Sequence, residues 1–387
     1  MFEILEKEPS GTVIKVVGVC GAGGNAVDHM IREGVQGVEF ICANTDAQAL
    51  GRSAAPLKLQ LGASGLVAGA KPDAGRTAAL EERERIAEAL TGAHMVFITA
   101  GMGGGTGTGA APIVAEVARE LGILTVAVVT KPFAFEGKRM KVAEQGLDDL
   151  AQHVDSLIVI LNERLMEVMG DDVSMHEAFK AADNVLRNAV GGIAEIINFP
   201  GLVNVDFEDV RTVMGEMGRA MMGAAFASGI DRARLAAEQA VASPLLEGIH
   251  LSGARGVLVN ITASTNLKMK EVNEVMNTIR EFAAEDAHII FGAVFDEEMQ
   301  DNLRVTVVAT GLGAGERAQQ LRPRMEVVAQ KTGTDNIPVL TDVDPNYAGD
   351  LSGVIKSRRS RASTIEALQN SGMDKLDIPA FLRKQAD

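Results

Sequence analysis

The sequence has very few large aromatic residues and a shortage of positive charge. It contains no tryptophan and a single tyrosine, Tyr347. Proteins that hold single-stranded nucleic acids stack the bases on such rings, so this class of function is not expected. Lysine and arginine number 37 against 52 aspartates and glutamates, which gives a formal net charge of −15. Because affinity for a phosphate backbone depends on its neutralisation by lysine and arginine, general nucleic-acid binding is not expected either.

Long apolar segments are also missing. No apolar run reaches the roughly 18 residues that a membrane-spanning helix needs. The first residues, Met1–Glu8, lack the basic-then-apolar order of a signal peptide. We therefore expect a cytoplasmic protein without direct insertion into a membrane. The two cysteines, Cys20 and Cys42, fit a reducing compartment and are expected to be free thiols, and the six histidines lack the spacing of metal ligands.

Glycine, in contrast, is abundant, and the richest stretch runs from Gly103 to Gly109. It follows an apolar run, Met95–Ala100, that is typical of a buried strand. It precedes Ala110–Ala118, which predicts a helix with Pro112 in its first turn. A strand, a glycine loop and a helix in this order present backbone N–H groups and a positive helix end to an anion. Such tracts also serve as flexible linkers, but apolar elements seldom flank a linker on both sides, so we favour a phosphate-binding loop.

The first half of the chain alternates strands with helices. Strands are predicted at 12–19, 38–43, 95–100, 123–129 and 156–161. This alternation predicts an α/β domain with a parallel sheet that is covered on both faces. A second glycine-rich segment, Gly21–Ala26, follows the first of these strands.

Gly21–Ala26 also fits G-x-G-x-x-A, the dinucleotide fingerprint, and Asp46 follows the next strand, where an acid would hold a ribose. A nicotinamide-dependent oxidoreductase is therefore an alternative function. A single fingerprint is weak evidence, and this alternative leaves Gly103–Gly109 without a role. Two glycine loops at the ends of parallel strands suit a polyphosphate that is held from two sides. The sequence contains no G-x-x-x-x-G-K-[ST] motif, which excludes a P-loop enzyme.

A long helix is predicted next, from Ser174 to Asn198. Its apolar residues recur every three or four positions, and Ser174 and Glu177 have capping-box spacing at its start. About 24 residues at 1.5 Å each would span roughly 36 Å, enough to bridge two domains. Further strands at 256–262, 288–294 and 303–309, with helices near 231–243 and 269–285, predict a smaller α+β domain with a mixed sheet.

An acidic segment, Asn204–Asp209, lies between the long helix and these strands. Asp206 and Asp209 have the spacing of an N-cap residue and an N3 acid, so capping of the next helix would explain both. That helix is predicted to carry a set of core methionines, Met214, Met217, Met221 and Met222.

The end of the chain has a different composition. Residues 316–375 are polar and interrupted by proline, which predicts a disordered linker with a basic cluster at Lys356–Arg361. Large apolar residues return in Leu376–Asp387. This is the form of a short peptide that folds onto partner proteins, although a helix docked on the chain's own body would show the same pattern.

Three motifs together carry a family resemblance: Gly103–Gly109, Asn204–Asp209 and Leu376–Asp387. In their order and spacing the chain resembles the FtsZ family of tubulin-like bacterial cell-division GTPases. The likeness is continuous from about Thr12 to Gly315 and returns at the tail. It implies a GTP-binding domain at 1–173, a connecting helix at 174–199, an α+β domain at 200–315, a linker at 316–375 and a partner-binding peptide at 376–387.

The resemblance also implies how GTP or GDP would be bound, with Mg²⁺ at the phosphates. Glu136 would lie near the ribose and Arg139 near the phosphates. Asn162 and Asp183 would contact the guanine edge, and Phe179 would stack on the ring. A carboxylate at Asp183 can accept hydrogen bonds from both N1–H and N2–H of guanine, which adenine cannot offer; the adjacent Asn184 is the alternative. The residues near the phosphates would be Gly21, Gly23, Gly24, Asn25, Gly103, Gly104, Gly105, Thr106, Gly107, Thr108 and Gly109, with Thr108 nearest the metal.

Catalysis in this family implies a second copy of the chain. Asp206 and Asp209 would polarise the water that attacks the γ-phosphate of a neighbouring subunit's GTP, with Asn204 helping to place that water. A head-to-tail contact that does not close gives an open filament. The tail would bind membrane-tethering and regulatory division proteins, and the protein would lie at the mid-cell division ring beneath the inner membrane.

The sequence departs from the family pattern in two places. The loop from Gly62 to Pro72 is a few residues shorter than usual and carries Lys71 where the family usually has asparagine, and the 136–139 turn has one basic residue fewer. We expect these changes to alter the rate of hydrolysis rather than the substrate. A third hypothesis, a scaffold that binds nucleotide without turning it over, is disfavoured by the intact acidic segment.

Overall fold

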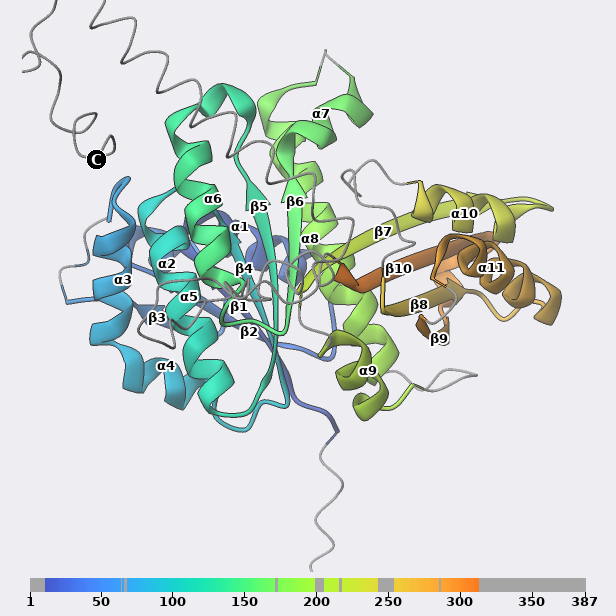
Figure 1. Cartoon of the computed structure of the whole chain (residues 1–387), viewed down its shortest axis with the longest axis horizontal. Coiled ribbons are helices and arrows are strands. Elements are labelled where there is room, and N and C mark those ends of the chain that lie inside the picture. The colour runs from blue at the N-terminus through green and yellow to red at the C-terminus, as the bar shows by residue number, and fades with distance from the viewer. Residues whose placement is uncertain are drawn as a thin grey trace, which may run out of the picture. The chain divides into compact units, whose positions relative to one another are not determined.

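A computed structural model of the chain describes residues 11–63, 65, 68–170, 173–198, 205–215, 218–242, 254–284 and 287–312. All of them belong to the first of two compact units, Met1–Arg322. Asn204, the linker and the tail peptide Leu376–Asp387 lie outside the described residues. One sheet of ten strands runs through the described ranges, in the order β3-β2-β1-β4-β5-β6-β7-β10-β8-β9 (Figure 1).

The first six strands in this order are parallel, as the alternation of strands and helices predicts. Successive residues of a strand point to opposite faces, so strands that are covered on both sides become continuously apolar. In the fourth strand, Met95 and Phe97 face one core and Val96 and Ile98 face the other. These strands are β1 (Ile14–Val19), β2 (Glu39–Asn44), β3 (Leu57–Gln60), β4 (Met95–Gly101), β5 (Leu124–Lys131) and β6 (Ser156–Leu161).

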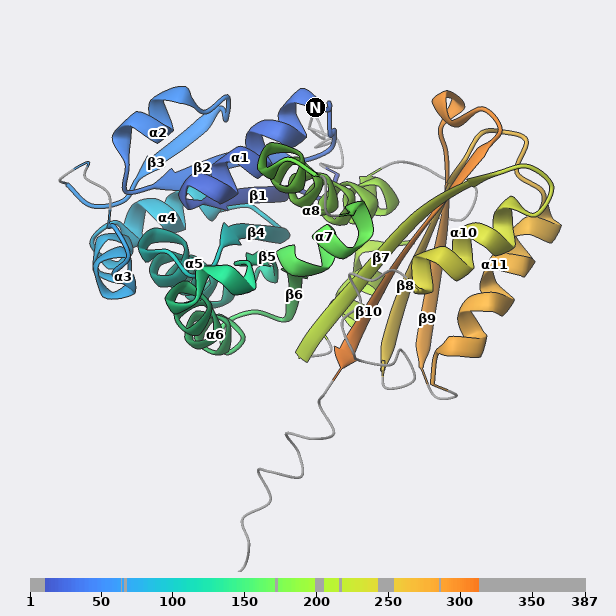
Figure 2. The same cartoon turned by 90° about the horizontal axis from the view of Figure 1, so that it is seen from above.

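Helices cover both faces of this parallel part, as Figure 2 shows. One face carries α1 (Cys20–Arg32) and α8 (Met175–Asn198). The other face carries α3 (Pro72–Glu81), α4 (Arg83–Leu90), α5 (Gly105–Glu120) and α6 (Lys138–Leu150). Shorter elements connect them at α2 (Ala47–Arg52), η1 (Ala134–Glu136) and α7 (Asn162–Met169).

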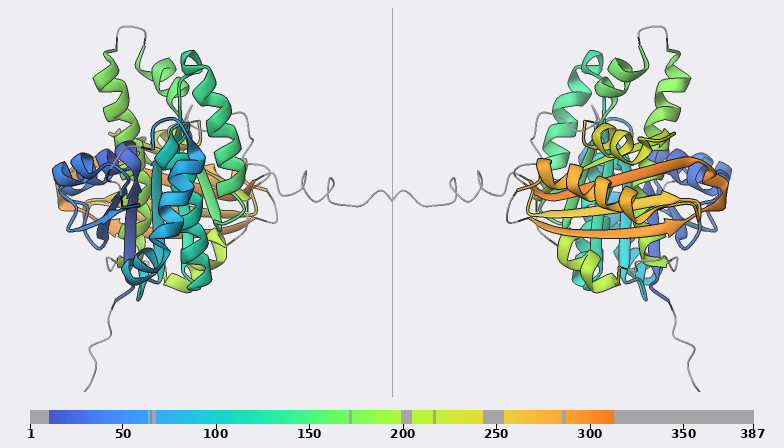
Figure 3. Two further views of the ribbon diagram at one scale, coloured as in Figure 1. Left: turned by 90° about the vertical axis from the view of Figure 1, so that its left-hand side faces the viewer. Right: turned by 90° about the vertical axis from the view of Figure 1, so that its right-hand side faces the viewer.

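The C-terminal strands extend the same sheet and make it mixed. β6 pairs in parallel with β7 through Ser156–Ile158 and Gly218–Ala220. β10 is antiparallel to both β7 and β8, and β8 is parallel to β9. Figure 3 shows helices lying across the outer face of these strands. The elements are α9 (Phe207–Met214), β7 (Gly218–Ser228), α10 (Arg232–Val241), β8 (Gly256–Ala263), α11 (Met269–Phe282), β9 (His288–Phe295), η3 (Glu297–Met299) and β10 (Asn302–Leu312).

The predicted methionine helix is wrong. The helix ends at Met214, and Met221 and Met222 lie in β7, where they face opposite sides of the sheet. Met217 lies outside the described residues. β7 contains glycine, alanine and methionine and lacks the β-branched residues that mark a strand, so pairing with β6 and β10 decides its conformation rather than local preference.

Helix α8 runs along the junction between the two parts of the sheet, and its 24 residues match the predicted length. Ser174 and Glu177 form the predicted capping box, in which each side chain bonds the other residue's backbone N–H at 3.2 and 3.0 Å. At its other end Asn198 donates to the carbonyl of Gly37, which precedes β2. Helix α8 therefore extends from the carboxyl edge of the parallel strands to their amino edge.

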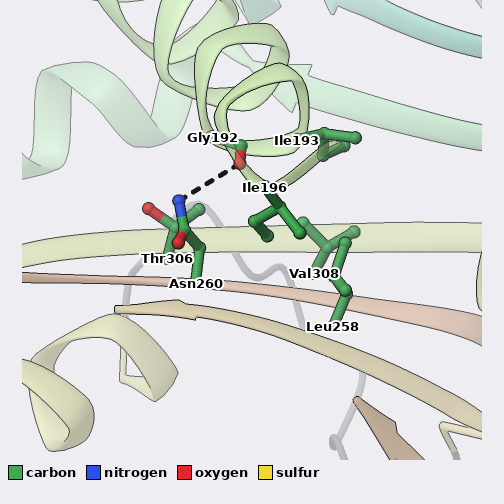
Figure 4. A pocket seen from close by; sticks show the side chains of 7 residues that line it. All are labelled: Gly192, Ile193, Ile196, Leu258, Asn260, Thr306 and Val308. Atoms are coloured by element: carbon green, nitrogen blue, oxygen red, sulfur yellow. Dashed lines mark hydrogen bonds between the residues drawn. The ribbon is translucent and has the colours of Figure 1, made fainter. Parts of the chain in front are cut away.

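Helix α8 packs against the C-terminal strands at a small buried pocket (Figure 4). Its walls are Gly192, Ile193 and Ile196 of α8, Leu258 and Asn260 of β8, and Thr306 and Val308 of β10. Asn260 donates to the Gly192 carbonyl at 3.2 Å, and Arg304 of β10 pairs with Glu195 of α8. Burial raises the pKa of Glu195 against the opposing effect of Arg304.

Two further expectations from the sequence concern membrane-spanning helices and the state of the two cysteines. None of the helices in the described ranges has the length and hydropathy that crossing a membrane requires. Cys20 and Cys42 are both free thiols, and burial raises the pKa of Cys42.

Candidate functional site

Two helix N-termini meet at the carboxyl edge of the central strands. β1 leads directly into α1, and β4 leads through Met102–Gly104 into α5. Neither helix has a side-chain cap or an acidic residue in its first turn. The first N–H groups of a helix lack intrahelical acceptors and carry partial positive charge. Two such ends on adjacent strands form a strong binding position for an anion with several negative charges.

Both helices begin inside the glycine-rich segments, which corrects the prediction of longer loops. Helix α5 starts at Gly105 rather than Ala110, so Pro112 lies well inside it, and Gly21–Asn25 belong to the first turns of α1. The cause is close packing of backbone on backbone. A Cβ atom at Gly105 would lie 2.5 Å from the Gly69 carbonyl oxygen, and one at Gly109 would collide with the Pro72 carbonyl oxygen.

The remaining loop, Met102–Gly104, is held in place by hydroxyl groups. Gly103 has φ +94°, and its N–H donates to the buried hydroxyl of Thr108 at 2.8 Å. The Thr106 hydroxyl bonds Thr45, the residue after β2, at 2.7 Å. These contacts give both threonines a part in shaping the loop. The role of Thr108 near Mg²⁺ stays a prediction.

The turn after β5 lies over this loop. Glu136 accepts a hydrogen bond from the N–H of Phe133 at 3.1 Å and pairs with Arg139 at 2.5 Å. The Arg139 side chain is 57% exposed, and its Nη2 atom would lie 3.9 Å from a Cβ at Gly104. The Arg139 side chain thus lies beside the glycine loop while it is paired with Glu136, and it can contact an anion there if it leaves that carboxylate.

Three phenylalanines gather next to this turn. Phe133 stacks on Phe135, with ring centroids 5.2 Å apart, and contacts Phe179 of α8 edge-on at 5.9 Å. Phe135 is 70% and Phe179 is 45% exposed, although large apolar side chains favour burial. Phe133 and Phe135 were not among the residues predicted from the sequence, although two apolar rings in a polar turn after a strand are a signal of such a role.

Two hydrogen-bond acceptors lie near these rings. Asp183 follows Phe179 by one turn on the same face of α8. Asn162 begins α7, and the adjacent Glu163 accepts from the N–H of Ala134 at 2.9 Å, which ties α7 to the phenylalanine turn. Asn162 is 6% exposed, and its Oδ1 has no hydrogen-bond partner within the described ranges. A buried acceptor without a donor is rare, so it points to a donor outside the chain.

The environment of Asp183 disfavours its charged form. Burial raises the pKa of Asp183 from 3.8 to about 6, while His29 and Arg32 of α1 act in the opposite direction. A partly buried carboxylate that accepts no hydrogen bond from the described residues favours a ligand that supplies N–H groups. Guanine offers N1–H and N2–H on one edge, whereas adenine has no donor at N1.

The two predicted catalytic acids lie at the other edge of the sheet. Asp206 caps α9 by accepting from the N–H of Asp209 at 2.8 Å, and both side chains are exposed. Phe207 contacts His94 edge-on at 6.1 Å, and His94 immediately precedes β4. The glycine loop follows the far end of β4, whose seven residues span about 23 Å at about 3.3 Å each. Figure 1 shows α9 at the lower edge, where the chain enters β1, and α7 at the upper edge.

The acids and the glycine loops of one copy therefore cannot act on the same bound molecule. The predicted third member of the acidic group, Asn204, lies outside the described residues. The capping role that the spacing of Asp206 and Asp209 predicts is confirmed.

Asp46, which supported the oxidoreductase alternative, has a structural role. Its carboxylate caps α2 by accepting from the N–H groups of Gln48 and Ala49 at 2.8 and 3.3 Å. These two bonds explain an acid at this position without a ribose.

Comparisons with known proteins agree with this arrangement. The model of the Tubulin/FtsZ family GTPase domain matches residues 13–170, and that of the FtsZ family C-terminal domain matches residues 218–313. A GTPase-domain match at the fingerprint removes the oxidoreductase alternative. Cell division protein FtsZ of Azotobacter vinelandii is 54% identical over 397 residues, and that of Pseudomonas aeruginosa is 54% identical over 395 residues, each match covering 100% of both chains.

Solved structures give the same result. An empty FtsZ dimer from M. jannaschii is similar with a TM-score of 0.75 and 41% identity, over 86% of this chain and 96% of that one. The resemblance drawn from the three sequence motifs and the α/β fold with a mixed C-terminal sheet are both confirmed. The chain belongs to the FtsZ family, and residues 13–170 form its GTPase domain.

Proposed function

We propose that this chain binds GTP at the carboxyl edge of β1, β4, β5 and β6, and hydrolyses it where a second copy supplies Asp206 and Asp209. Within the FtsZ family the chain is a polymerising, GTP-binding cell-division protein with GTPase activity. One observation carries the shared-site mechanism: the two acids lie at the opposite edge of the sheet from the glycine loops.

The phosphates of GTP would contact the N-termini of α1 and α5, with Arg139 beside them. The supporting features are the two helix N-termini without side-chain caps and the glycine loop, which the hydrogen bond to Thr108 holds in place. The ribose would lie near Glu136. The residues proposed to line the phosphates are Gly21, Gly23, Gly24, Asn25 and Gly103–Gly109.

The base would lie among Phe179, Asn162 and Asp183. The half-exposed ring of Phe179 offers a stacking surface, and the unpartnered Oδ1 of Asn162 and the carboxylate of Asp183 offer acceptors. In this arrangement the buried Oδ1 of Asn162 and the partly buried carboxylate of Asp183 would remain unpaired with adenine. Because an unpaired buried acceptor is costly, we expect strong preference for guanine.

Hydrolysis would take place at the contact between two copies. Asp206 and Asp209 are exposed at the start of α9, where they can meet the γ-phosphate region of the next subunit. Their carboxylates would orient and polarise the attacking water, assisted by Asn204. The helix N-termini that hold the phosphates would stabilise the charge that develops on them.

Mg²⁺ is expected to accompany the nucleotide. The described residues contain no group of three His, Cys, Asp or Glu side chains that could hold a metal ion. Mg²⁺ commonly takes phosphate oxygens and water as most of its ligands, and Thr108 is the residue of this chain that we propose nearest to it. When bound, the ion would neutralise phosphate charge.

A contact between the acidic edge of one copy and the nucleotide edge of the next is heterologous, so repeating it gives an open filament. We keep the five-part division at 1–173, 174–199, 200–315, 316–375 and 376–387 as part of this proposal. The filament would form the division ring at mid-cell, in the cytoplasm beneath the inner membrane. Leu376–Asp387 would bind membrane-tethering and regulatory proteins, and deleting it should spare filaments while abolishing that binding.

The GTPase rate as a function of protein concentration tests the proposal. A shared site predicts that the rate per molecule rises steeply above the assembly threshold. A rate per molecule that is the same well below and well above the threshold would exclude the shared site. Binding of GTP without phosphate release at any concentration would instead favour the nucleotide-binding scaffold.

A further inference from the structure

A buried histidine links the helix at the phosphates to the helix at the base. His29 lies on α1, is 3% exposed, and its Nε2 atom is 2.7 Å from Oδ1 of Asn184 on α8. An amide oxygen only accepts hydrogen bonds, so in this orientation Nε2 carries the proton and donates. The N-terminus of α1 belongs to the phosphate site, and Asn184 directly follows Asp183.

The link decides which of two adjacent residues is available to the base. Asp183 and Asn184 are both polar acceptors, and sequence spacing alone leaves either as the one that contacts guanine. The hydrogen bond from His29 holds the Oδ1 of Asn184 on the α1 side, which leaves Asp183 as the better-placed acceptor for a ligand. Phe179, one turn earlier than Asp183 on the same face of α8, marks the direction of the base.

The charges around Asp183 agree with this division of roles. The groups that act on its carboxylate are His29 and Arg32, both on α1. Asp28, also on α1, points to the segment after α2. There its carboxylate accepts hydrogen bonds from the Ser53 hydroxyl and the N–H of Ala54. Arg187 of α8 donates to Asn188.

We propose that His29 is a positioning residue for guanine recognition: by holding Asn184 it fixes this turn of α8 so that Asp183 presents its carboxylate to the base. The inference rests on the proposed GTP site and deepens it. An amide can donate as well as accept, so a released Asn184 would compete with Asp183 and tolerate bases with fewer N–H donors. His29 thereby couples the phosphate helix to the specificity of the base pocket.

The test compares GTP with inosine triphosphate, which keeps the N1–H of guanine and lacks its 2-amino group. Affinities are measured by calorimetry on the full-length chain. For the unaltered protein we expect GTP to bind at least about tenfold more tightly, because loss of one hydrogen bond to a charged acceptor has about this effect. His29→Leu should reduce this ratio to within about threefold of unity. His29→Gln keeps an N–H donor near the Nε2 position and should retain the ratio.

Two further variants complete the test. His153→Leu, just after α6 and beside Asp149, is a matched control and should leave both affinities unchanged. Asn184→Ala removes the acceptor instead of the donor and should reproduce the reduced ratio, which also covers the case in which His29→Leu does not fold. The affinity for GTP should fall below about pH 6 as Asp183 takes up a proton, and this midpoint should move to higher pH in His29→Leu.

Equal loss of affinity for both nucleotides in His29→Leu and Asn184→Ala would show a merely structural residue and overturn the inference. An unchanged ratio of GTP to inosine triphosphate affinity in these variants would also overturn it. The same holds if His29→Gln loses this ratio as fully as His29→Leu does. If the unaltered protein fails to bind GTP, the proposed function itself fails. If it discriminates between the two nucleotides and the variants keep that discrimination, only the role of His29 is wrong.

Discussion

Asp206→Ser should separate the two roles that Asp206 has in this structure. The carboxylate caps α9 by accepting from the N–H of Asp209 at 2.8 Å. Serine caps a helix about as well as aspartate, so the variant keeps the cap and loses only the favourable charge at the helix N-terminus, about 0.3–1 kcal/mol. Asp206→Ala loses the cap as well, at a cost of about 1 kcal/mol more. Urea unfolding should rank the two variants in this order.

The effect on hydrolysis should be much larger than the effect on stability. Removing a group that orients and polarises the attacking water costs about 10²–10⁴ in rate. Asp206→Ser and Asp209→Ala should therefore both lose most turnover, measured as phosphate release well above the assembly threshold. Both should keep GTP affinity, because the nucleotide edge of the same copy lies about 23 Å away at the other end of β4.

A comparison of the two substitutions at position 206 can refute this reasoning. If Asp206→Ser hydrolyses GTP at the unaltered rate while Asp206→Ala is slow, the residue acts by capping α9 and has no part in the chemistry. If Asp206→Ser fails to bind GTP in its own pocket, the assignment of the two edges is wrong.

Two further predictions concern stability. The pKa of Asp183 is raised from 3.8 to about 6 in the folded chain, so between these values the native state binds more protons than the unfolded state and stability falls as pH rises. Asp183→Asn should therefore unfold at higher urea concentration than the unaltered nucleotide-free protein at pH 7.5, with the difference vanishing below about pH 4; a constant difference would contradict this. Gly109→Ala should destabilise the chain by about 1–3 kcal/mol, because its Cβ would collide with the Pro72 carbonyl oxygen. Gly51→Ala, with nothing within 4 Å of its Cβ, is the control and should be neutral or stabilising by up to about 1 kcal/mol.

Much of the fold follows from local pattern. The strand at Met95, the capping box of Ser174 and Glu177 and the apolar stripe of α8 all have strong periodic or capping signals, and the structure contains each of them. β7 has no such signal, because it lacks β-branched residues and its alanines favour helix, so pairing with β6 and β10 decides its conformation. Helix α5 begins earlier than expected because Gly105 packs against the loop before α3 and Gly109 against the first turn of α3, contacts that sequence spacing does not reveal.

The candidate site was predictable as a set of segments and not as a geometry. Glycine runs after strands indicate a phosphate site because helix N-termini follow them. The position of Asp206 and Asp209 at the opposite edge depends on how α9 packs beside His94, which only the fold establishes. The sequence favours Asp183 over Asn184 because a carboxylate suits two N–H donors, but the contact of Asn184 with His29 is visible only in the fold.

Mixing two inactive variants tests the shared site most directly. Asp183→Ala should lose GTP binding and keep the acids, while Asp209→Ala should keep GTP binding and lose an acid. In mixed filaments a contact is complete when an Asp209→Ala copy supplies the GTP and an Asp183→Ala neighbour supplies the acids. Each side has the required variant with a probability of one half, so about a quarter of the contacts in a random 1:1 mixture are complete. A double variant mixed with Asp209→Ala is the control and should restore nothing. We predict a GTPase rate in the 1:1 mixture well above the sum of the two separate rates, and a rate equal to that sum would contradict the shared site.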